Sequence, residues 1–494
     1  MLRAIAVVLA VVLSPVAAGA QVSPLWSSDE IRAHRPADEV EALAFDLHRQ
    51  ASGSGKRSVT TDQVVTLAPS FSLIAEGKQR VLDDHLLCRI LAWKTDSATV
   101  DNQNCYAAAA FRDLEVRNRA VLGQMMAKIG PSAPSQMVYW GEAELGIGAP
   151  GAPANPLEVR TSGEGAEYRL DRAVVARFKG SAGEVSAEEM QRVTRFLAQH
   201  VNLHPQVRRG IAMKGRLPAT IETETGPTKI GDGRQVITLS NLRRVRLAYP
   251  LPPGLESALA ARARTGRTPR DLAIRRVDAV ITGAAPRPSL EATIAQLRKA
   301  SGAGHDLEAV MLLMELTQDY PAFFSAPASD TNAQAAISEV RALLRPRMAG
   351  PDAAAYLKAN ELAGDPKAVG DRQAAARFLA LTPNLDALPF GTFRRVTYAN
   401  LVASSEGTKG WDPAILKAMP ADLVDNYWIH IASHPWAANA YKDAGDTYYR
   451  NYETPDAWIA FDLGRAVDPN WRAGVLGTVA KYEESLRTDQ PDFF

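Results

Sequence analysis

Two pairs of histidines have the spacing that places two imidazoles on one face of a helix, the arrangement that binds zinc in many metalloenzymes. The pairs are His200 with His204 and His430 with His434. Neither pair contains the glutamate of an HExxH motif, and each second histidine precedes a proline. Because a residue before proline disfavours the α conformation, each pair is expected to straddle a helix end. We predict no metal site and no cofactor.

The Asp83-Asp84-His85 segment is a second candidate for acid–base chemistry. In a strand, Asp83 and His85 would lie on the same face, where the carboxylate could orient the imidazole. A solvent-facing strand surface is the alternative explanation for the same residues. The sequence contains no GxSxG elbow and no aspartic-protease motif. We therefore assign no catalytic residue and expect a protein that is not an enzyme, although the sequence leaves this open.

The chain has two cysteines, Cys88 and Cys105. In an oxidising compartment an even pair at short separation predicts a disulfide, which stabilises the fold by about 3 kcal/mol through loop closure. Residues 81–93 and 100–106 are predicted to form two strands that face each other, which brings the cysteines together. A redox or nucleophilic thiol is the alternative, but the sequence has no CxxC pairing.

The first twenty residues are predicted to be a cleavable signal peptide. Arg3 provides the positive charge, residues 4–13 form a short apolar core, and Ala18-Gly19-Ala20 supplies small residues for cleavage before Gln21. A retained signal anchor is the alternative. Later apolar runs are shorter than the roughly 18 residues that a membrane helix needs. We therefore expect a periplasmic or secreted protein that does not span a membrane.

The charges of the chain are balanced. It has 56 Lys and Arg residues against 55 Asp and Glu residues, a formal net charge of +1. Nucleic-acid binding depends on concentrated positive charge, so we predict no nucleic-acid partner. With 494 residues, 46% of them hydrophobic, the chain is long enough for two or three cores.

Residues 21–58 are predicted to form a short helix followed by a flexible linker. The helix is inferred from the spacing of apolar residues, which are Val40, Leu43, Ala44 and Leu47. The linker is the stretch rich in glycine and serine at residues 53–58.

Residues 59–252 contain both strand and helix patterns, without the regular alternation of a doubly wound sheet. This combination predicts an α+β domain. Apolar and charged residues alternate clearly over residues 166–179, which predicts a strand with one buried face.

Further elements of this domain are marked by their ends. Ser186 and Glu189 have the spacing of a capping box, which predicts a helix from there to about His200. Two strands are predicted to flank the tight turn at residues 231–233. A break in the alternation at residues 241–242 is consistent with a β-bulge.

Helices are the only regular elements predicted for residues 253–494. Apolar residues recur at helical spacing in many short segments separated by turns. The predicted helices cover residues 254–264, 269–281, 289–300, 306–318, 331–345, 351–362, 366–380, 413–419, 421–433 and 471–486. Helices joined in this way favour a stack of helical hairpins, an α-solenoid.

One segment near the C-terminus has a repeat pattern. Pro435 and Pro469 lie 34 residues apart, which is the tetratricopeptide period. Between them, the small and aromatic positions of that repeat are matched by Tyr441, Gly445, Tyr448, Ala457, Phe461 and Gly464. Ala444 stands where the repeat usually has leucine. The segment from about 438 to 471 therefore resembles a tetratricopeptide repeat (TPR).

The resemblance implies a packing role for the matched residues and a binding role for others. In this family, partners are usually held on the concave face by the first helix of each repeat. The corresponding positions here are Asn439, Lys442, Asp446, Tyr449 and Arg450. Lys442 and Arg450 could donate charge-assisted hydrogen bonds to an acidic or C-terminal peptide. Ordinary solvated residues are the alternative.

The sequence thus predicts an α+β domain followed by an all-α, TPR-like helical array. The predicted function is binding or scaffolding of another protein or peptide in the cell envelope. The alternative is a cell-envelope hydrolase with its site in the α+β domain. A His–carboxylate pair in a polar cleft would favour the hydrolase, and a charged concave groove would favour the binding protein. A self-associating structural protein is a third possibility.

Overall fold

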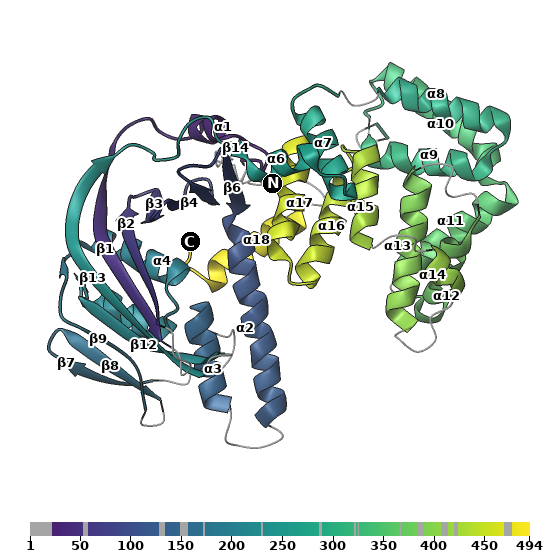
Figure 1. The fold of residues 1–494 in the computed structure, drawn as a ribbon. Coiled ribbons are helices and arrows are strands. Elements are labelled where there is room, and N and C mark those ends of the chain that lie inside the picture. Colours follow the sequence, from purple (N-terminus) through teal and green to yellow (C-terminus); the bar gives the residue numbers. More distant parts are fainter. Residues whose placement is uncertain are drawn as a thin grey trace, which may run out of the picture.

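The computed structural model describes most of the chain (Figure 1). The described residues are 22–52, 58–127, 134–148, 157–170, 173–228, 231–285, 289–320, 323–324, 326–365, 367–383, 389–406, 413–418, 423–468 and 477–494. The predicted features that lie outside them are the signal peptide of residues 1–20, the mature N-terminus at Gln21, most of the linker, Pro469, and residues 471–476 at the beginning of the last predicted helix.

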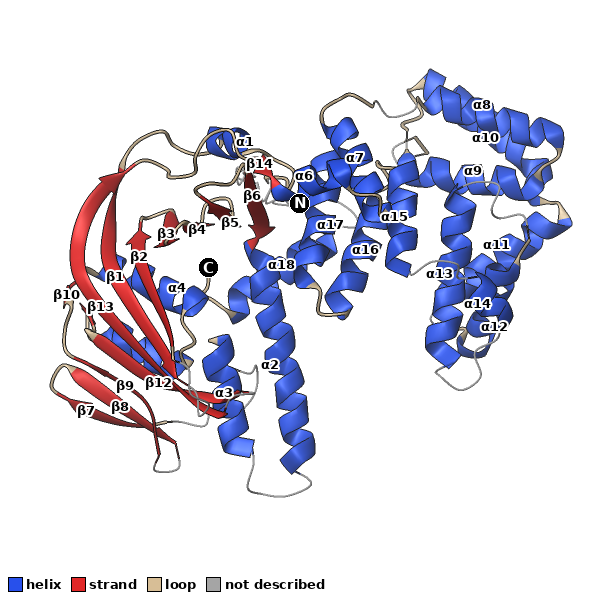
Figure 2. Cartoon of the chain, in the orientation of Figure 1, coloured by secondary structure: helices blue, strands red, loops and turns tan. Residues whose placement is uncertain are grey.

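Strands gather in the N-terminal half and helices make up the C-terminal half, so the predicted α+β class is confirmed (Figure 2). In the described residues, the large sheet has twelve strands in the order β14-β6-β5-β4-β3-β2-β1-β13-β12-β9-β8-β7. These strands are β1 (Val40–Ser52), β2 (Val59–Leu67), β3 (Phe71–Glu76), β4 (Gln79–Asp84), β5 (Arg89–Lys94), β6 (Thr99–Asn104), β7 (Glu158–Ser162), β8 (Gly165–Leu170), β9 (Ala173–Lys179), β12 (Thr220–Thr228), β13 (Gly231–Leu247) and β14 (Glu256–Ser257). The strands β14 and β6 are parallel, and all other adjacent strands of this sheet are antiparallel. A small second sheet pairs β10 (Gly183–Glu184) with β11 (Arg216–Leu217).

Five helices accompany the sheet. They are α1 (Ser28–Ala33), α2 (Cys105–Ala127), α3 (Pro134–Leu145), α4 (Ala187–His200) and α5 (Pro205–Met213). Side chains from α3, α4 and α5 share one core with β1, β2, β8, β9 and β13. The opposite face of the sheet, around β3 to β6, is covered by α1 and residues 249–255. The sheet curves around α4, and the C-terminus lies within that curve (Figure 1).

The helix predicted over residues 40–47 is wrong, because this segment is the beginning of β1. Leu43, Phe45 and Leu47 alternate onto the face that α4 covers and are fully buried. Ala42 points to the other face and is buried there as well. A strand that is buried on both faces loses the alternation of apolar and polar residues, so its apolar residues also match helical spacing.

Two segments predicted as single strands are hairpins. Residues 81–93 span the end of β4 and most of β5, and residues 166–179 span β8 and β9. After β4, the carboxylate of Asp84 accepts hydrogen bonds from the backbone N–H groups of Leu86 (3.0 Å) and Leu87 (2.8 Å). This side-chain bonding to nearby backbone is what turns the chain there.

Other local predictions are confirmed. Ser186 and Glu189 form the capping box at the beginning of α4, and the helix ends at His200. The bulge at residues 241–242 is present, since the register between β1 and β13 shifts there. Asn241 takes a left-handed backbone conformation (φ 54°) that accommodates the extra residues.

From residue 258 the described chain is helical. The helices are α6 (Ala258–Thr265), α7 (Pro269–Ile281), α8 (Leu290–Ala303), α9 (Asp306–Asp319), α10 (Thr331–Met348), α11 (Pro351–Gly364), α12 (Val369–Leu381), α13 (Pro389–Glu406), α14 (Pro413–Ala418), α15 (Leu423–Ser433), α16 (Ala438–Arg450), α17 (Thr454–Val467) and α18 (Gly477–Asp489). Most agree with the predicted segments, whereas α13 lies where no helix is predicted. Gly391 and two threonines, Thr392 and Thr397, lower the helix propensity of α13. None of the described helices has both the length and the apolar character to cross a bilayer.

The predicted disulfide between Cys88 and Cys105 is confirmed, with their Cα atoms 5.1 Å apart. The predicted placement of both cysteines within facing strands is wrong, because Cys88 lies in the turn before β5 and Cys105 is the first residue of α2. The bond therefore ties the turn between β4 and β5 to the beginning of the long helix.

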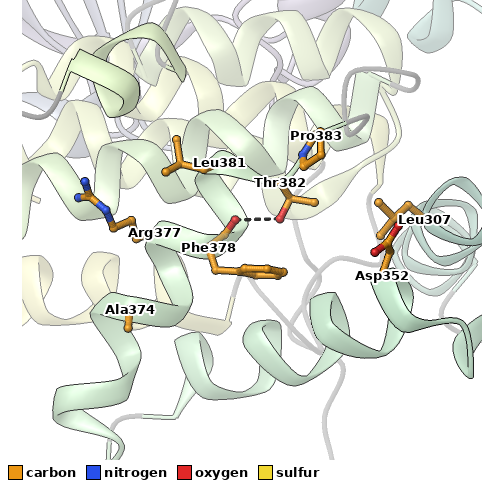
Figure 3. Close-up of a pocket in the computed structure, with 8 residues that line it drawn as sticks. All are labelled: Leu307, Asp352, Ala374, Arg377, Phe378, Leu381, Thr382 and Pro383. Atoms are coloured by element: carbon orange, nitrogen blue, oxygen red, sulfur yellow. Dashed lines mark hydrogen bonds between the residues drawn. The ribbon is translucent and has the colours of Figure 1, made fainter.

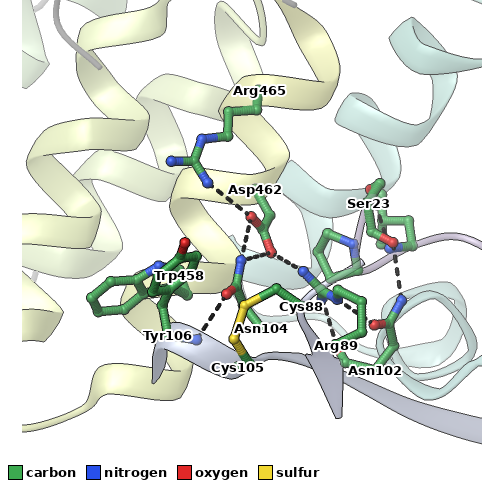
Figure 4. A network of polar contacts seen from close by, with 12 residues as sticks. Ser23, Cys88, Arg89, Asn102, Asn104, Cys105, Tyr106, Trp458, Asp462 and Arg465 are labelled. Atoms are coloured by element: carbon green, nitrogen blue, oxygen red, sulfur yellow. Dashed lines mark hydrogen bonds and ion pairs between the residues drawn. A yellow bond between two sulfur atoms is a disulfide. The ribbon is translucent and has the colours of Figure 1, made fainter. Parts of the chain in front are cut away.

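A buried polar network beside this disulfide joins the sheet to the helical array (Figure 4). Arg89 of β5 forms an ion pair with Asp462 of α17, and each side chain is 1% exposed. Asn104 donates to Asp462 at 3.0 Å, and Asn102 accepts from Arg89 at 2.7 Å. Arg465, one turn along α17, lies 3.5 Å from the same carboxylate. We call this network the joint.

Candidate functional site

The candidate binding site is a pocket of about 440 Å³ in the helical array. It lies between the beginnings of α9 and α11 and the C-terminal half of α12 (Figure 3). The residues that line it are Leu307, Asp352, Ala374, Arg377, Phe378, Leu381, Thr382 and Pro383.

The helix α12 forms most of the pocket because it is apolar on two faces. One face is buried in the core of the array and consists of Ala375, Ala376, Leu379 and Ala380. Ala374, Phe378 and Leu381 recur at helical spacing on a second face, which lines the pocket. On this face Phe378 is 44% and Leu381 is 42% exposed. Thr382 donates to the carbonyl of Phe378 at 2.8 Å and so holds the end of the helix in place.

Two opposite charges lie on either side of the apolar surface. Figure 3 shows Phe378 between Arg377 on one side and Asp352 on the other. Asp352 is in the first turn of α11, where a carboxylate is favoured by the helix dipole. A pocket with an apolar floor and one charge of each sign can bind an apolar side chain and fix the direction of the segment that carries it.

The residues predicted to bind a partner lie on α16 and do not line this pocket. Asn439 and Arg450 are exposed. Lys442 pairs with Asp446 on its own helix at 2.5 Å, and both side chains are mostly buried. Tyr449 stacks on the ring of Tyr482 with 5.8 Å between centroids, so its ring contributes to packing.

The pocket residues are absent from the predicted site, although α12 itself is predicted. The sequence feature that could have revealed the pocket residues is the second row of apolar residues on α12. A helix of a two-layer array needs only one apolar face to pack, so Phe378 and Leu381 exceed what packing requires.

The histidine pairs straddle helix ends, as predicted. His200 is the last residue of α4 and lies 2.5 Å from Asp83, whereas His204 caps α5 and lies 2.9 Å from Glu142. In the second pair, His430 is within α15 and His434 follows its end.

The second pair lies in a more apolar environment. Burial lowers the pKa of His430 well below its usual value, and its ring stacks on Phe393 at 4.3 Å. His434 faces Glu315 at 3.4 Å, and this carboxylate raises the pKa of His434 against the effect of burial. In the part of the chain that the structure describes, no group of three or more His, Cys, Asp or Glu side chains is placed to hold a metal ion.

The Asp83-Asp84-His85 segment is a buried polar cluster. Asp83 is 3% exposed and pairs with His200, so it does not orient His85. The ring of His85 lies 3.0 Å from the hydroxyl of Ser72, which is 2% exposed. The serine, the histidine and the carboxylate therefore do not form one line of proton transfer, and we assign no reaction to them.

Comparisons with known proteins do not identify a family for this chain. No protein-family model matches the sequence, and no curated protein matches it. Among solved structures, one similar chain comes from a structure titled "Lipid-protein interactions in lipovitellin". The identity is 10% and the TM-score 0.13, over 90% of this chain and 54% of that one, so the chain spans about half the length of its neighbour. A likeness at this TM-score supports no conclusion about function.

Proposed function

We propose that this chain is an exported binding protein of the cell envelope, whose helical array holds a segment of a partner protein. The surface that we assign to this role is the pocket of α9, α11 and α12. The observation that carries the proposal is the exposure of Phe378 and Leu381, one turn apart, at a cavity. Exposed apolar surface beside a concave site is typical of interaction surfaces.

The chemistry of the pocket defines the kind of segment that it would bind. Its volume of about 440 Å³ suits an aromatic or branched aliphatic side chain with its neighbours. Asp352 would attract a basic residue beside this anchor. A short segment with an apolar anchor next to a basic residue is the expected ligand.

The packing of α16 against α17 supports a TPR-like architecture for this scaffold. A Cβ atom added to Gly445 would collide with the ring of Phe461. Tyr441, Ala457 and Phe461 are fully buried. These are the small and large residues that the resemblance assigns to packing, and their fit favours a repeat that presents surfaces on its neighbours to partners.

Photo-cross-linking from the pocket tests the proposal. Leu381 is replaced by p-benzoylphenylalanine, and the purified chain is irradiated in the exported protein fraction. We expect one cross-linked partner, which is lost when Phe378→Glu is added. The matched control carries the cross-linker at Met213 of α5, which is 82% exposed and distant in the fold.

Two outcomes would contradict the assignment. Recovery of the same proteins from positions 381 and 213 would mean that the cross-links are nonspecific. Partner capture that is insensitive to Phe378→Glu but lost in Lys442→Glu/Arg450→Glu would move the binding surface to α16.

A further inference from the structure

The last five residues of the chain, 490–494, lie against the α+β domain. The side chain of Gln490 donates to the backbone carbonyl of Ala109 in α2 at 2.8 Å. In the opposite direction, the side chain of Gln199 in α4 donates to the carbonyl of Phe493, also at 2.8 Å. The tail is therefore bonded to the domain through backbone groups as well as side chains.

A buried arginine receives the acidic residue of the tail. Arg208 of α5 is 3% exposed and donates to the carboxylate of Asp492 at 2.9 Å. The same guanidinium donates to the carbonyl of Gly146 at 3.0 Å. Because that carbonyl belongs to the domain, the domain itself holds Arg208 in position.

A second arginine receives the first aromatic ring. Arg112 of α2 lies 4.9 Å from the centroid of the Phe493 ring, which is 3% exposed. The guanidinium donates to the carbonyls of Ala198 (2.6 Å) and Gln199 (2.8 Å) at the end of α4. Burial lowers the pKa of Arg112 to about 10, so the group stays charged at neutral pH. Its position is again fixed by the domain.

The last residue, Phe494, packs against an aromatic ring and an arginine. The ring of Phe494 lies 5.0 Å from the ring of Tyr106. Arg487 of α18 lies 5.0 Å from the Phe494 ring and also donates to the hydroxyl of Tyr106. Both aromatic side chains of the tail thus contact a cation, an arrangement that adds to their apolar burial.

We infer that Tyr106, Ala109, Arg112, Gln199 and Arg208 form a cradle that binds a peptide segment in which an acidic residue precedes two aromatic residues. The chain's own Asp492-Phe493-Phe494 occupies the cradle in cis. A segment of a partner protein with the same acidic-aromatic-aromatic order is the ligand in trans.

The preformed arginines are the reason why the cradle can serve a second peptide. A site whose polar groups are held by the scaffold binds without first ordering them. A short segment that is held by a few contacts can leave its site by local opening while the rest of the protein stays folded. The tethered tail has an effective concentration in the millimolar range, so it protects the cradle from weak ligands.

Removal of the tail tests this inference with a defined probe. The chain is ended at Asp489, and a fluorescein-labelled peptide of residues 486–494 is titrated against it by fluorescence anisotropy. We expect the shortened chain to bind this peptide at least about 100-fold more tightly than the full chain does, because the competing tail is gone. A peptide with Phe493→Ala and Asp492→Lys is expected not to bind.

Substitutions in the shortened chain distinguish binding in the cradle from nonspecific binding of the peptide. Arg208→Ala is expected to weaken binding about 10-fold through loss of a charge-assisted bond. Arg209→Ala, a neighbouring exposed arginine, is the matched control and leaves binding unchanged. A shortened chain that is folded by circular dichroism but binds both peptides equally, or neither, would overturn the inference.

If the shortened chain does not fold, a second variant in the full chain still tests the inference. Phe493→Ala in the full chain weakens the resident tail and leaves its length intact. This variant is expected to bind the labelled peptide more tightly than the unmodified chain, and equal binding would again overturn the inference. Neither experiment involves Phe378 or Leu381, so failure here leaves the pocket of α12 untouched.

Discussion

The cradle of the α+β domain and the pocket of the helical array are built from similar side chains but differ in what covers them. In the cradle, Phe493 is 3% exposed and lies over Arg112. In the pocket, Phe378 is 44% exposed and lies beside Arg377. The chain thus covers one aromatic surface with its own tail and leaves the other open. Burial of the first stabilises the attachment of the tail, whereas the second remains exposed to solvent.

The joint and the outer helices of the array also differ in how deeply their contacts are buried. The joint holds an ion pair that is 1% exposed on both sides, with amide groups bonded to both partners. A buried pair of this kind is strongly destabilising to break, because the remaining charge is left without a partner. We therefore expect the region around β5, β6 and α17 to tolerate change poorly and the surface of α12 to tolerate it well.

Asp462→Ala is the change with the largest expected effect on this comparison. It leaves Arg89 buried without its carboxylate, and we expect a loss of about 3–5 kcal/mol in the free energy of unfolding. Urea denaturation followed by circular dichroism measures it. Lys78→Ala, which breaks the exposed pair with Asp96, is the control and is expected to cost less than about 1 kcal/mol. Similar losses in both variants would show that burial does not distinguish the joint.

Removal of the disulfide beside the joint is the next largest effect. The double variant Cys88→Ala/Cys105→Ala opens a loop of sequence separation 17, and we expect a loss of about 3 kcal/mol in the free energy of unfolding. The same measurement on the unmodified chain with and without reductant provides the control. A reductant-treated chain as stable as the oxidised one would mean that the joint alone holds this region.

The α+β domain is also expected to be sensitive to acid because of His85. Burial, helped by the nearby charge of Arg195, lowers the pKa of His85 to about 4. In the unfolded chain the imidazole takes up a proton near pH 6.5. The unfolded state therefore binds more protons between pH 6.5 and about 4, and stability is lost as the pH falls through this window. By pH 5 the loss is about 2 kcal/mol.

His85→Gln removes this contribution and is expected to flatten the pH dependence of urea denaturation between pH 7.5 and 5. His430, whose pKa is also lowered by burial, retains a dependence of the same sign in the variant. The unmodified chain, measured in parallel over the same pH range, is the control. An unchanged slope in His85→Gln would contradict the prediction.

The sequence carries enough information for most helices of the array and for the disulfide, because both depend on local patterns. Proline and glycine mark the helix ends, and two cysteines allow a single pairing. Strand β1 is misassigned because its two buried faces remove the alternation on which a strand prediction depends. The turn after β4 depends on Asp84, whose carboxylate bonds backbone groups two and three residues along, and this role is not distinguishable from that of its neighbour Asp83 in sequence.

The sites are harder to predict than the fold because their residues are distant in the chain. Arg208 and Asp492 are separated by 284 residues, and Arg89 and Asp462 by 373. No local pattern relates such pairs. The predicted binding face on α16 follows from the TPR resemblance, which assigns positions by analogy and cannot detect that Lys442 already pairs with Asp446.

Phe378→Ala is the variant with the smallest expected effect on stability and is the most informative about the open surface. Since the ring is 44% exposed, its loss is expected to change the free energy of unfolding by less than about 0.5 kcal/mol. Phe461→Ala, at a fully buried ring of the same array, is the comparison and is expected to cost about 3–5 kcal/mol. A loss above about 2 kcal/mol for Phe378→Ala would make its ring part of the core. Unchanged stability together with a lost partner would instead identify the ring as a residue that the fold does not need and binding does.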